Sequence, residues 1–267
     1  GVGRRMARPW GLLLLSWASL ALCRRCGVSE VIQPDGSYSL SGCDELSLFG
    51  AHVGDEGAQK LAEALEADPP LSLLDLWANG IGEAGARALG RALQKNTHLQ
   101  RLYLNENPLG AAGVAAIAEG LTKAMAPRHL WLSRTGAGDQ GAIAIAEALK
   151  TNRMLEALDM WECGITGVGA RALANALVGN VGLRTLELRA NPMGDEGARA
   201  FAGLMPYNKP LSTLDLLGTG ITTSGRHALR QGLAKADSRP YLVLFEDGIG
   251  PHQQRTSWEE KGATDAP

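Results

Sequence analysis

The feature that most constrains the fold of this chain is a 28-residue repeat. The stretch 71–99 ends where its own pattern begins again, and the same pattern restarts along most of the sequence. The repeats begin at Cys43, Leu71, Leu99, Pro127, Leu155, Leu183, Leu211 and Arg239. A fixed period of this size indicates stacked, similar units, because one such unit cannot bury its apolar face alone.

Each repeat predicts a short strand followed by a helix. Its fourth and sixth residues are apolar, as in Leu74 and Leu76, and this alternation indicates a strand with one buried face. Its second half carries apolar residues at three- and four-residue spacing, as in Leu89 and Leu93, which indicates a helix. A small side chain, often Asn, stands ninth and can bond the backbone where the strand ends.

This pattern resembles the leucine-rich repeat family, and within it the 28-residue ribonuclease-inhibitor-like class. NOD-like receptors and the Ran GTPase activator carry similar repeats. The resemblance covers residues 43–249, as seven whole repeats plus an eighth strand. It implies a curved α/β solenoid with short parallel strands on the concave face and helices on the convex face. Pro127 and Ala137 weaken the fourth repeat, so we expect a slight irregularity near Pro127.

The segments that flank the repeats differ in composition. Residues 1–23 hold a basic start, a 13-residue apolar core after Trp10 and small residues at Ala21 and Cys23, which fits a secretory signal peptide. That core is too short for a stable membrane span. An apolar segment covering the first repeat, or translated sequence ahead of the true start, fits as well. Residues 24–42 are interpreted as a polar lead-in, and residues 250–267 as a mobile tail.

The predicted localisation depends on whether residues 1–23 are a signal peptide. A cleaved signal peptide predicts a secreted protein or one of the secretory pathway, whereas relatives of this repeat class are mostly intracellular and favour the cytoplasm. N-terminal sequencing distinguishes them, because cleavage would leave a mature chain beginning near Arg24 and an intact start would be Met6.

The chain has four cysteines, Cys23, Cys26, Cys43 and Cys163. Cys26 and Cys43 could pair and clamp the N-terminal edge of the solenoid, or remain free thiols, since connectivity does not follow from sequence. We expect Cys163 to be a buried apolar residue of the turn. The cysteines and histidines show no metal-ligand spacing, so no metal and no cofactor are predicted.

Aromatic residues concentrate at strand positions that point away from the core. These are the third, fifth, seventh and eighth positions of each repeat, which face the concave side in this architecture. Seven of nine aromatic residues in the repeats fall there: Phe49, Trp77, Tyr103, Trp131, Trp161, Tyr241 and Phe245. Exposed Trp and Tyr are frequent binding hot spots, although stacked aromatics can also merely cover a sheet.

The same positions are rich in acidic residues. Eight carboxylates stand against Arg101, Arg134 and Arg189, a formal charge of −5. The acids are Glu45, Asp75, Glu106, Asp159, Glu162, Glu187, Asp215 and Glu246. Such a face favours a basic protein partner and disfavours nucleic acid, although a solvated face without a partner is the simpler alternative.

These observations predict a non-catalytic scaffold that binds a protein on its concave face. The residues expected to contact the partner are Phe49, Asp75, Trp77, Tyr103, Trp131, Asp159, Trp161, Glu187, Asp215 and Phe245. Two alternatives rest on the repeat class alone: a GTPase-activating module of the Ran-activator type, and the repeat part of a NOD-like sensor. No Ser/His/Asp or Cys/His arrangement indicates an enzyme.

Overall fold

The computed structural model describes residues 24–236 and 241–243. Within them, nine strands form a single parallel sheet in chain order. The strands are β1 (Arg25–Cys26), β2 (Glu45–Ser47), β3 (Leu73–Asp75), β4 (Arg101–Tyr103), β5 (His129–Trp131), β6 (Ala157–Asp159), β7 (Thr185–Glu187), β8 (Thr213–Asp215) and β9 (Tyr241–Val243).

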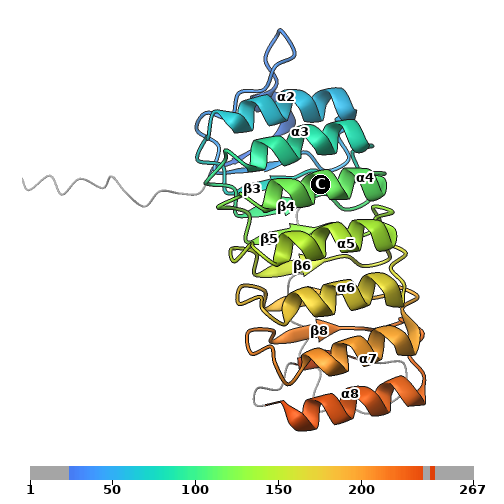
Figure 1. Ribbon diagram of the computed structural model, residues 1–267. Helices are drawn as coiled ribbons and strands as arrows, with labels where there is room; N and C mark the ends of the chain where they lie inside the picture. The colour runs from blue at the N-terminus through green and yellow to red at the C-terminus, as the bar shows by residue number, and fades with distance from the viewer. Residues whose placement is uncertain (1–23, 237–240, 244–267) are drawn as a thin grey trace, which may run out of the picture.

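A helix follows each strand from β1 to β8. The helices are α1 (Val28–Val31), α2 (Gly54–Glu66), α3 (Glu83–Leu93), α4 (Gly110–Leu121), α5 (Gly138–Leu149), α6 (Gly167–Leu177), α7 (Gly194–Leu204) and α8 (Thr223–Lys235). From α2 to α8 they lie side by side in one layer over one face of the sheet (Figure 1). This arrangement confirms the predicted α/β solenoid.

The 28-residue period sets the register of the sheet. Leu46 pairs with Leu74, and Leu74 pairs with Leu102, each exactly one repeat further along the chain. These fourth-position leucines and the sixth-position residues after them are buried between the sheet and the helices. β5 pairs in the same register although the peptide bond before Pro127, two residues upstream, is cis. The irregularity expected at Pro127 therefore leaves the sheet unbroken.

The two layers differ in spacing, and this difference gives the solenoid its curvature. Neighbouring strands stand about 4.8 Å apart, whereas packed helices need about 8–10 Å between their axes. Each repeat contributes one strand and one helix, so the helical layer is longer and the strands line the concave side.

Buried asparagines connect neighbouring repeats at the turns after β3, β4 and β7. The side chain of Asn107 accepts hydrogen bonds from the backbone N–H groups of Asn79 and Ile81 in the preceding repeat. It donates to the carbonyl oxygens of Leu76 and Leu104. Cys163 occupies the same position in its repeat, is buried, and donates its thiol to the carbonyl of a neighbouring repeat. Burial raises the pKa of this thiol.

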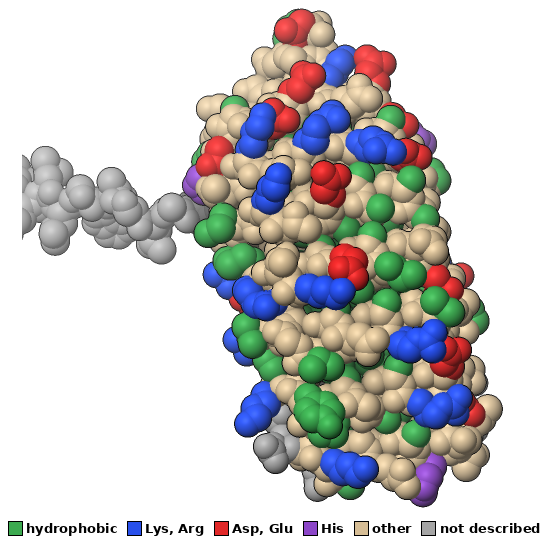
Figure 2. Space-filling view, in the orientation of Figure 1, with side chains coloured by type: hydrophobic (Ala, Val, Ile, Leu, Met, Phe, Trp, Pro, Cys, Tyr) green, Lys and Arg blue, Asp and Glu red, His purple; other side chains and the backbone are tan. Residues whose placement is uncertain are grey.

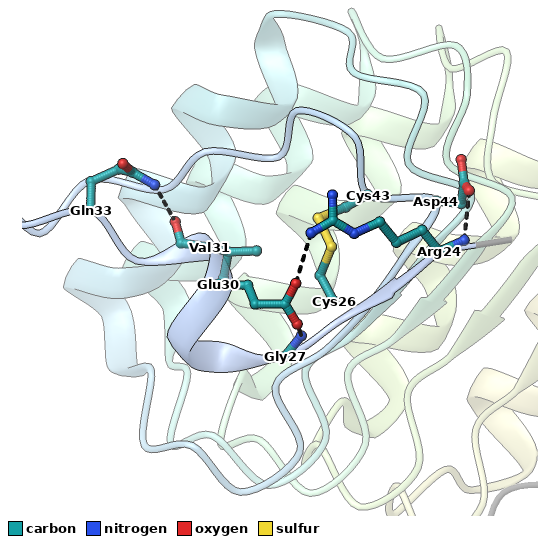
Figure 3. Close-up of a disulfide and its surroundings, with 8 residues drawn as sticks. All are labelled: Arg24, Cys26, Gly27, Glu30, Val31, Gln33, Cys43 and Asp44. Atoms are coloured by element: carbon teal, nitrogen blue, oxygen red, sulfur yellow. Dashed lines mark hydrogen bonds and ion pairs between the residues drawn. A yellow bond between two sulfur atoms is a disulfide. The ribbon is translucent and has the colours of Figure 1, made fainter.

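The N-terminal lead-in is an integral part of the fold. β1 extends the sheet, and Val31 and Leu40 are buried against the first repeat. A disulfide joins Cys26 on β1 to Cys43 at the start of that repeat (Figure 3). The sequence alone predicted only a polar lead-in and left the pairing open. The structure shows a capping element that covers the first repeat.

Several sequence interpretations lie outside the described residues. They are the signal peptide at 1–23, the tail at 250–267, Phe245 and Glu246. β9 continues the predicted eighth repeat strand, and only its backbone is described. No helix within the described part of the chain is long and apolar enough to span a membrane.

Candidate binding face

The candidate site is the strand face that points away from the helices. Side chains alternate along each strand, so the central residue enters the core and its two neighbours reach the other face. From β2 to β7 the central residue is buried and the flanking residues are half-buried. We call this surface the strand face. It presents the third and fifth positions of the repeats and most of the seventh and eighth, whereas Asn105 and Ser133 at the seventh position are buried.

Four aromatic residues on this face form two contacting pairs. Phe49, which is 62% exposed, meets Trp77 edge to face with ring centroids 5.7 Å apart. Tyr103 and Trp131 on adjacent strands stack with centroids 4.1 Å apart and planes inclined by 11°. His129 contacts the Trp131 ring edge to face at 5.6 Å. The repeats therefore place residues 28 positions apart in the sequence in direct ring contact.

Burial changes the chemistry of two of these side chains. The pKa of Tyr103 is raised, chiefly because its hydroxyl lies in a partly desolvated environment. The pKa of His129 is lowered by burial, so the imidazole favours the neutral form. Both side chains present rings with little charge to the solvent, which suits apolar and stacking contacts.

A charged ladder runs beside the aromatic residues. Arg134 bonds Glu162 at 2.7 Å and Glu106 at 3.0 Å, with each partner one repeat away. Hydrogen bonds to Glu162 and Glu106 raise the pKa of the Arg134 guanidinium. The same guanidinium lies 4.5 Å from the ring centroid of Trp161. The ladder thus holds a cation against the fifth aromatic residue of the face.

Three aspartates that the sequence places in the binding site also stabilise the turns after their strands. One oxygen of Asp75, Asp159 and Asp215 accepts a hydrogen bond from the backbone N–H two residues further on. The donors are Trp77 (3.0 Å), Trp161 (2.8 Å) and Leu217 (3.0 Å). The second oxygens accept from Ser47 Oγ, Ser133 Oγ and Arg189 Nε. These carboxylates therefore already have hydrogen-bond partners within the fold, and their contact with a partner protein stays a prediction.

Burial limits the contacts that two of these aspartates can make outside the fold. Asp215 is only 4% exposed, so a partner has little access to it. Burial raises the pKa of Asp159, which its bonds to Ser133 and Trp161 only partly offset. Glu187 stands between these two aspartates in the sheet register. At the other end of the face, Glu45 bonds both Arg25 and Arg101.

Sequence reasoning missed these internal pairs. Glu106, Arg134 and Glu162 occupy the eighth position of three successive repeats, so opposite charges recur at 28-residue spacing. That spacing was the available signal, because equal positions of adjacent repeats become neighbours in the sheet. Within residues 24–236 and 241–243, no group of three or more His, Cys, Asp or Glu side chains is placed to hold a metal ion.

Comparison with known proteins identifies the repeat. A sequence model described as leucine-rich repeat matches four segments, residues 45–62, 95–118, 151–174 and 180–202. Each segment covers one strand and most of the helix that follows it. The chain therefore contains leucine-rich repeats.

Similarity to individual proteins is more distant. The solved structure of actin-binding site 2 of leiomodin-1 is similar to this chain, with 20% sequence identity and a TM-score of 0.41. The likeness covers 65% of this chain and 86% of that one. No curated protein matches the sequence.

Proposed function

We propose that the chain is a non-catalytic scaffold that binds a protein partner on its strand face. The observation that carries this proposal is the row of aromatic side chains across β2–β6. Phe49 meets Trp77, Tyr103 stacks on Trp131, and Trp161 lies under Arg134. Aromatic residues and arginine dominate the binding energy of protein interfaces, because they combine large apolar area with directional contacts.

The charge of the face supports a basic partner. Among the described residues of the face, seven carboxylates stand against Arg25, Arg101, Arg134 and Arg189. Most of these acids already have hydrogen-bond or ion-pair partners in the fold, so the negative electrostatic potential of the face is weak. A field of this kind speeds association with a basic protein more than it tightens binding. The aromatic residues are then the main source of affinity.

The repeat length supports membership of the ribonuclease-inhibitor-like class. The Cys26–Cys43 disulfide supports folding in an oxidising compartment, where such bonds persist. We therefore infer a secreted protein or one of the secretory pathway, with the cytoplasm as the alternative. N-terminal sequencing of the mature protein tests this inference. A chain beginning near Arg24 agrees with it, and an intact Met6 contradicts it.

Affinity capture from native extract tests the binding face. Three baits are compared: the natural chain, the double variant Trp131→Ala/Trp161→Ala, and Tyr207→Lys, which removes an exposed aromatic residue from the helical side. Circular dichroism checks that all three are folded. We expect the natural chain and Tyr207→Lys to retain a protein that the double variant loses. Equal retention by all three baits would place the site elsewhere.

A further inference from the structure

The helical side of the solenoid carries a hollow between α6 and α7. It has a volume of about 540 Å³ and lies on the face opposite the strand face. Small residues Ala174, Ala200 and Gly203 contribute to its lining, together with the apolar side chains of Val178 and Tyr207. Arg171 and Glu196 also line it and form an ion pair of 2.7 Å.

Two sequence features distinguish this hollow from the same place in the other described repeats. The position of Gly203 carries a larger polar or charged side chain in the other described repeats: Glu63, Arg91, Glu119, Glu147, Asn175 and Gln231. A Cβ atom at Gly203 would meet nothing within 4 Å, so the glycine leaves open space. The position of Tyr207 carries lysine in three other repeats, as Lys95, Lys123 and Lys235. The remaining described repeats carry Ala67, Thr151 and Gly179 there, so among the described repeats only this one has an aromatic residue at that position.

Exposed apolar side chains gather around the hollow. Tyr207 is 69% exposed and Val178 is 48% exposed, and both line the hollow. Val181, in the same repeat as Val178, is 63% exposed. Scattered exposed apolar residues are ordinary on a protein surface, but a cluster beside a hollow indicates a contact site. These residues would lose solvent contact if another element packed there.

The surrounding charge is basic. Helices α6, α7 and α8 carry five basic residues, Arg171, Arg199, Arg226, Arg230 and Lys235. Their two acids are engaged within the fold, Glu196 with Arg171 and Asp195 with Thr222. By contrast, α2 carries four acids and one lysine. Figure 2 shows this face, with basic side chains predominating over α6–α8 and mixed charges over α2 and α3.

We propose that this hollow docks an acidic amphipathic helix of a partner protein. The lining residues Arg171 and Val178 are seven positions apart on and just beyond α6, which corresponds to about 10 Å along a helix. That length matches apolar side chains at positions i, i+3 or i+4, and i+7 of a docked helix. Carboxylates on its flanks would face Arg199 and the basic surface of α8. This second contact site is independent of the strand face.

The test uses displayed helical peptides of about 15 residues as probes. All carry randomised apolar residues at i, i+3, i+4 and i+7, and the flanks hold either Glu and Asp or Lys and Arg. The bait is the full chain, either natural or as Gly203→Glu, Tyr207→Lys or the control Thr151→Lys. Each substitution introduces a residue that other repeats carry at the same position. Circular dichroism and thermal melting check the fold of each variant.

We expect acidic peptides to be enriched on the natural chain and on Thr151→Lys. A selected acidic peptide should lose at least about tenfold in affinity on Gly203→Glu and on Tyr207→Lys, because both changes alter the centre of the contact. Three results would overturn the proposal. They are no enrichment of any peptide, equal enrichment of basic peptides, and an affinity that neither Gly203→Glu nor Tyr207→Lys changes. Sedimentation velocity provides a further check. A concentration-dependent dimer that Gly203→Glu abolishes would assign the hollow to a second copy of this chain and would also overturn it.

Discussion

At the scale of single residues, buried asparagines connect one repeat to the next. Asn107 is fully buried, and its side chain bonds five backbone groups. We expect Asn107→Ala to lower the free energy of unfolding by about 3 kcal/mol, because buried backbone groups would lose their partners. Chemical denaturation measures this loss. Gln94→Ala, at the partly exposed end of α3, is the control and should change stability by less than about 0.5 kcal/mol.

Asp139 connects two repeats at the entrance to α6, and its contribution depends on pH. Partial burial raises its pKa, but bonds from Thr166 and Gly169 outweigh burial and hold the pKa below its usual value. A lowered pKa in the folded state gives stability that is present above the unfolded value of about 3.9 and is lost as pH falls through the folded value.

We therefore expect Asp139→Asn to lower stability by about 1 kcal/mol near neutral pH, a modest value because the site is partly exposed. The difference between the two proteins should shrink as pH falls below about 4. Urea denaturation at several pH values measures it. A difference that stays constant with pH would contradict the role of the charged carboxylate.

At the scale of elements, glycines have different roles in two helix pairs. They allow α3 and α4 to pack closely, and one of them leaves a hollow between α6 and α7. α3 and α4 approach through Gly90 and Gly120, and a Cβ atom on Gly120 would overlap the carbonyl of Gly90. A Cβ atom on Gly203 of α7 meets open space. The same residue type thus allows close packing in one place and leaves a hollow in the other.

We expect the two alanine substitutions to have opposite signs. Gly120→Ala should destabilise the protein by about 2 kcal/mol through overpacking, whereas Gly203→Ala should stabilise it by about 0.5–1 kcal/mol through a lower entropy of the unfolded chain. Thermal and chemical unfolding of both variants check this. Equal effects would mean that α3 and α4 do not pack as closely as described.

At the scale of the whole molecule, each repeat contacts mainly its neighbours, so the ends limit stability. The Cys26–Cys43 disulfide fastens the N-terminal cap to the first repeat. We expect Cys26→Ser/Cys43→Ser to lower the free energy of unfolding by about 2–4 kcal/mol. In this variant, backbone amide hydrogen exchange should become faster at β1 and β2, whereas the amides of α5 and α6 should remain protected. Uniform loss of protection would show that the repeats unfold as one unit.

The whole molecule also presents two separate surfaces. The aromatic strand face lies on one side of the sheet, and the hollow between α6 and α7 lies on the helical side. A partner on one surface leaves the other accessible, so the chain could hold two proteins at once. The double variant of Trp131 and Trp161 and the variant of Gly203 separate the two contacts experimentally.

The sequence by itself determined the repeat, the positions of strands and helices, and the solenoid. Its 28-residue pattern was sufficient because every unit is local and meets mainly its neighbours. The same pattern placed Trp77, Tyr103 and Trp131 on one face, since strand side chains alternate. The N-terminal cap was not predicted, because β1 and α1 are short and lie outside the repeat.

Only the tertiary structure decided which charged side chains form hydrogen bonds and ion pairs within the fold. Asp75, Asp159 and Asp215 resemble exposed acids in the sequence, yet their oxygens bond turn amides and neighbouring side chains. The hollow beside Gly203 likewise depends on how two helices pack. Such contacts join residues far apart in the chain, and their strength depends on burial. The local pattern predicts which face of a strand is buried, but not how far the neighbouring repeats cover an individual polar side chain, and only their packing decides that.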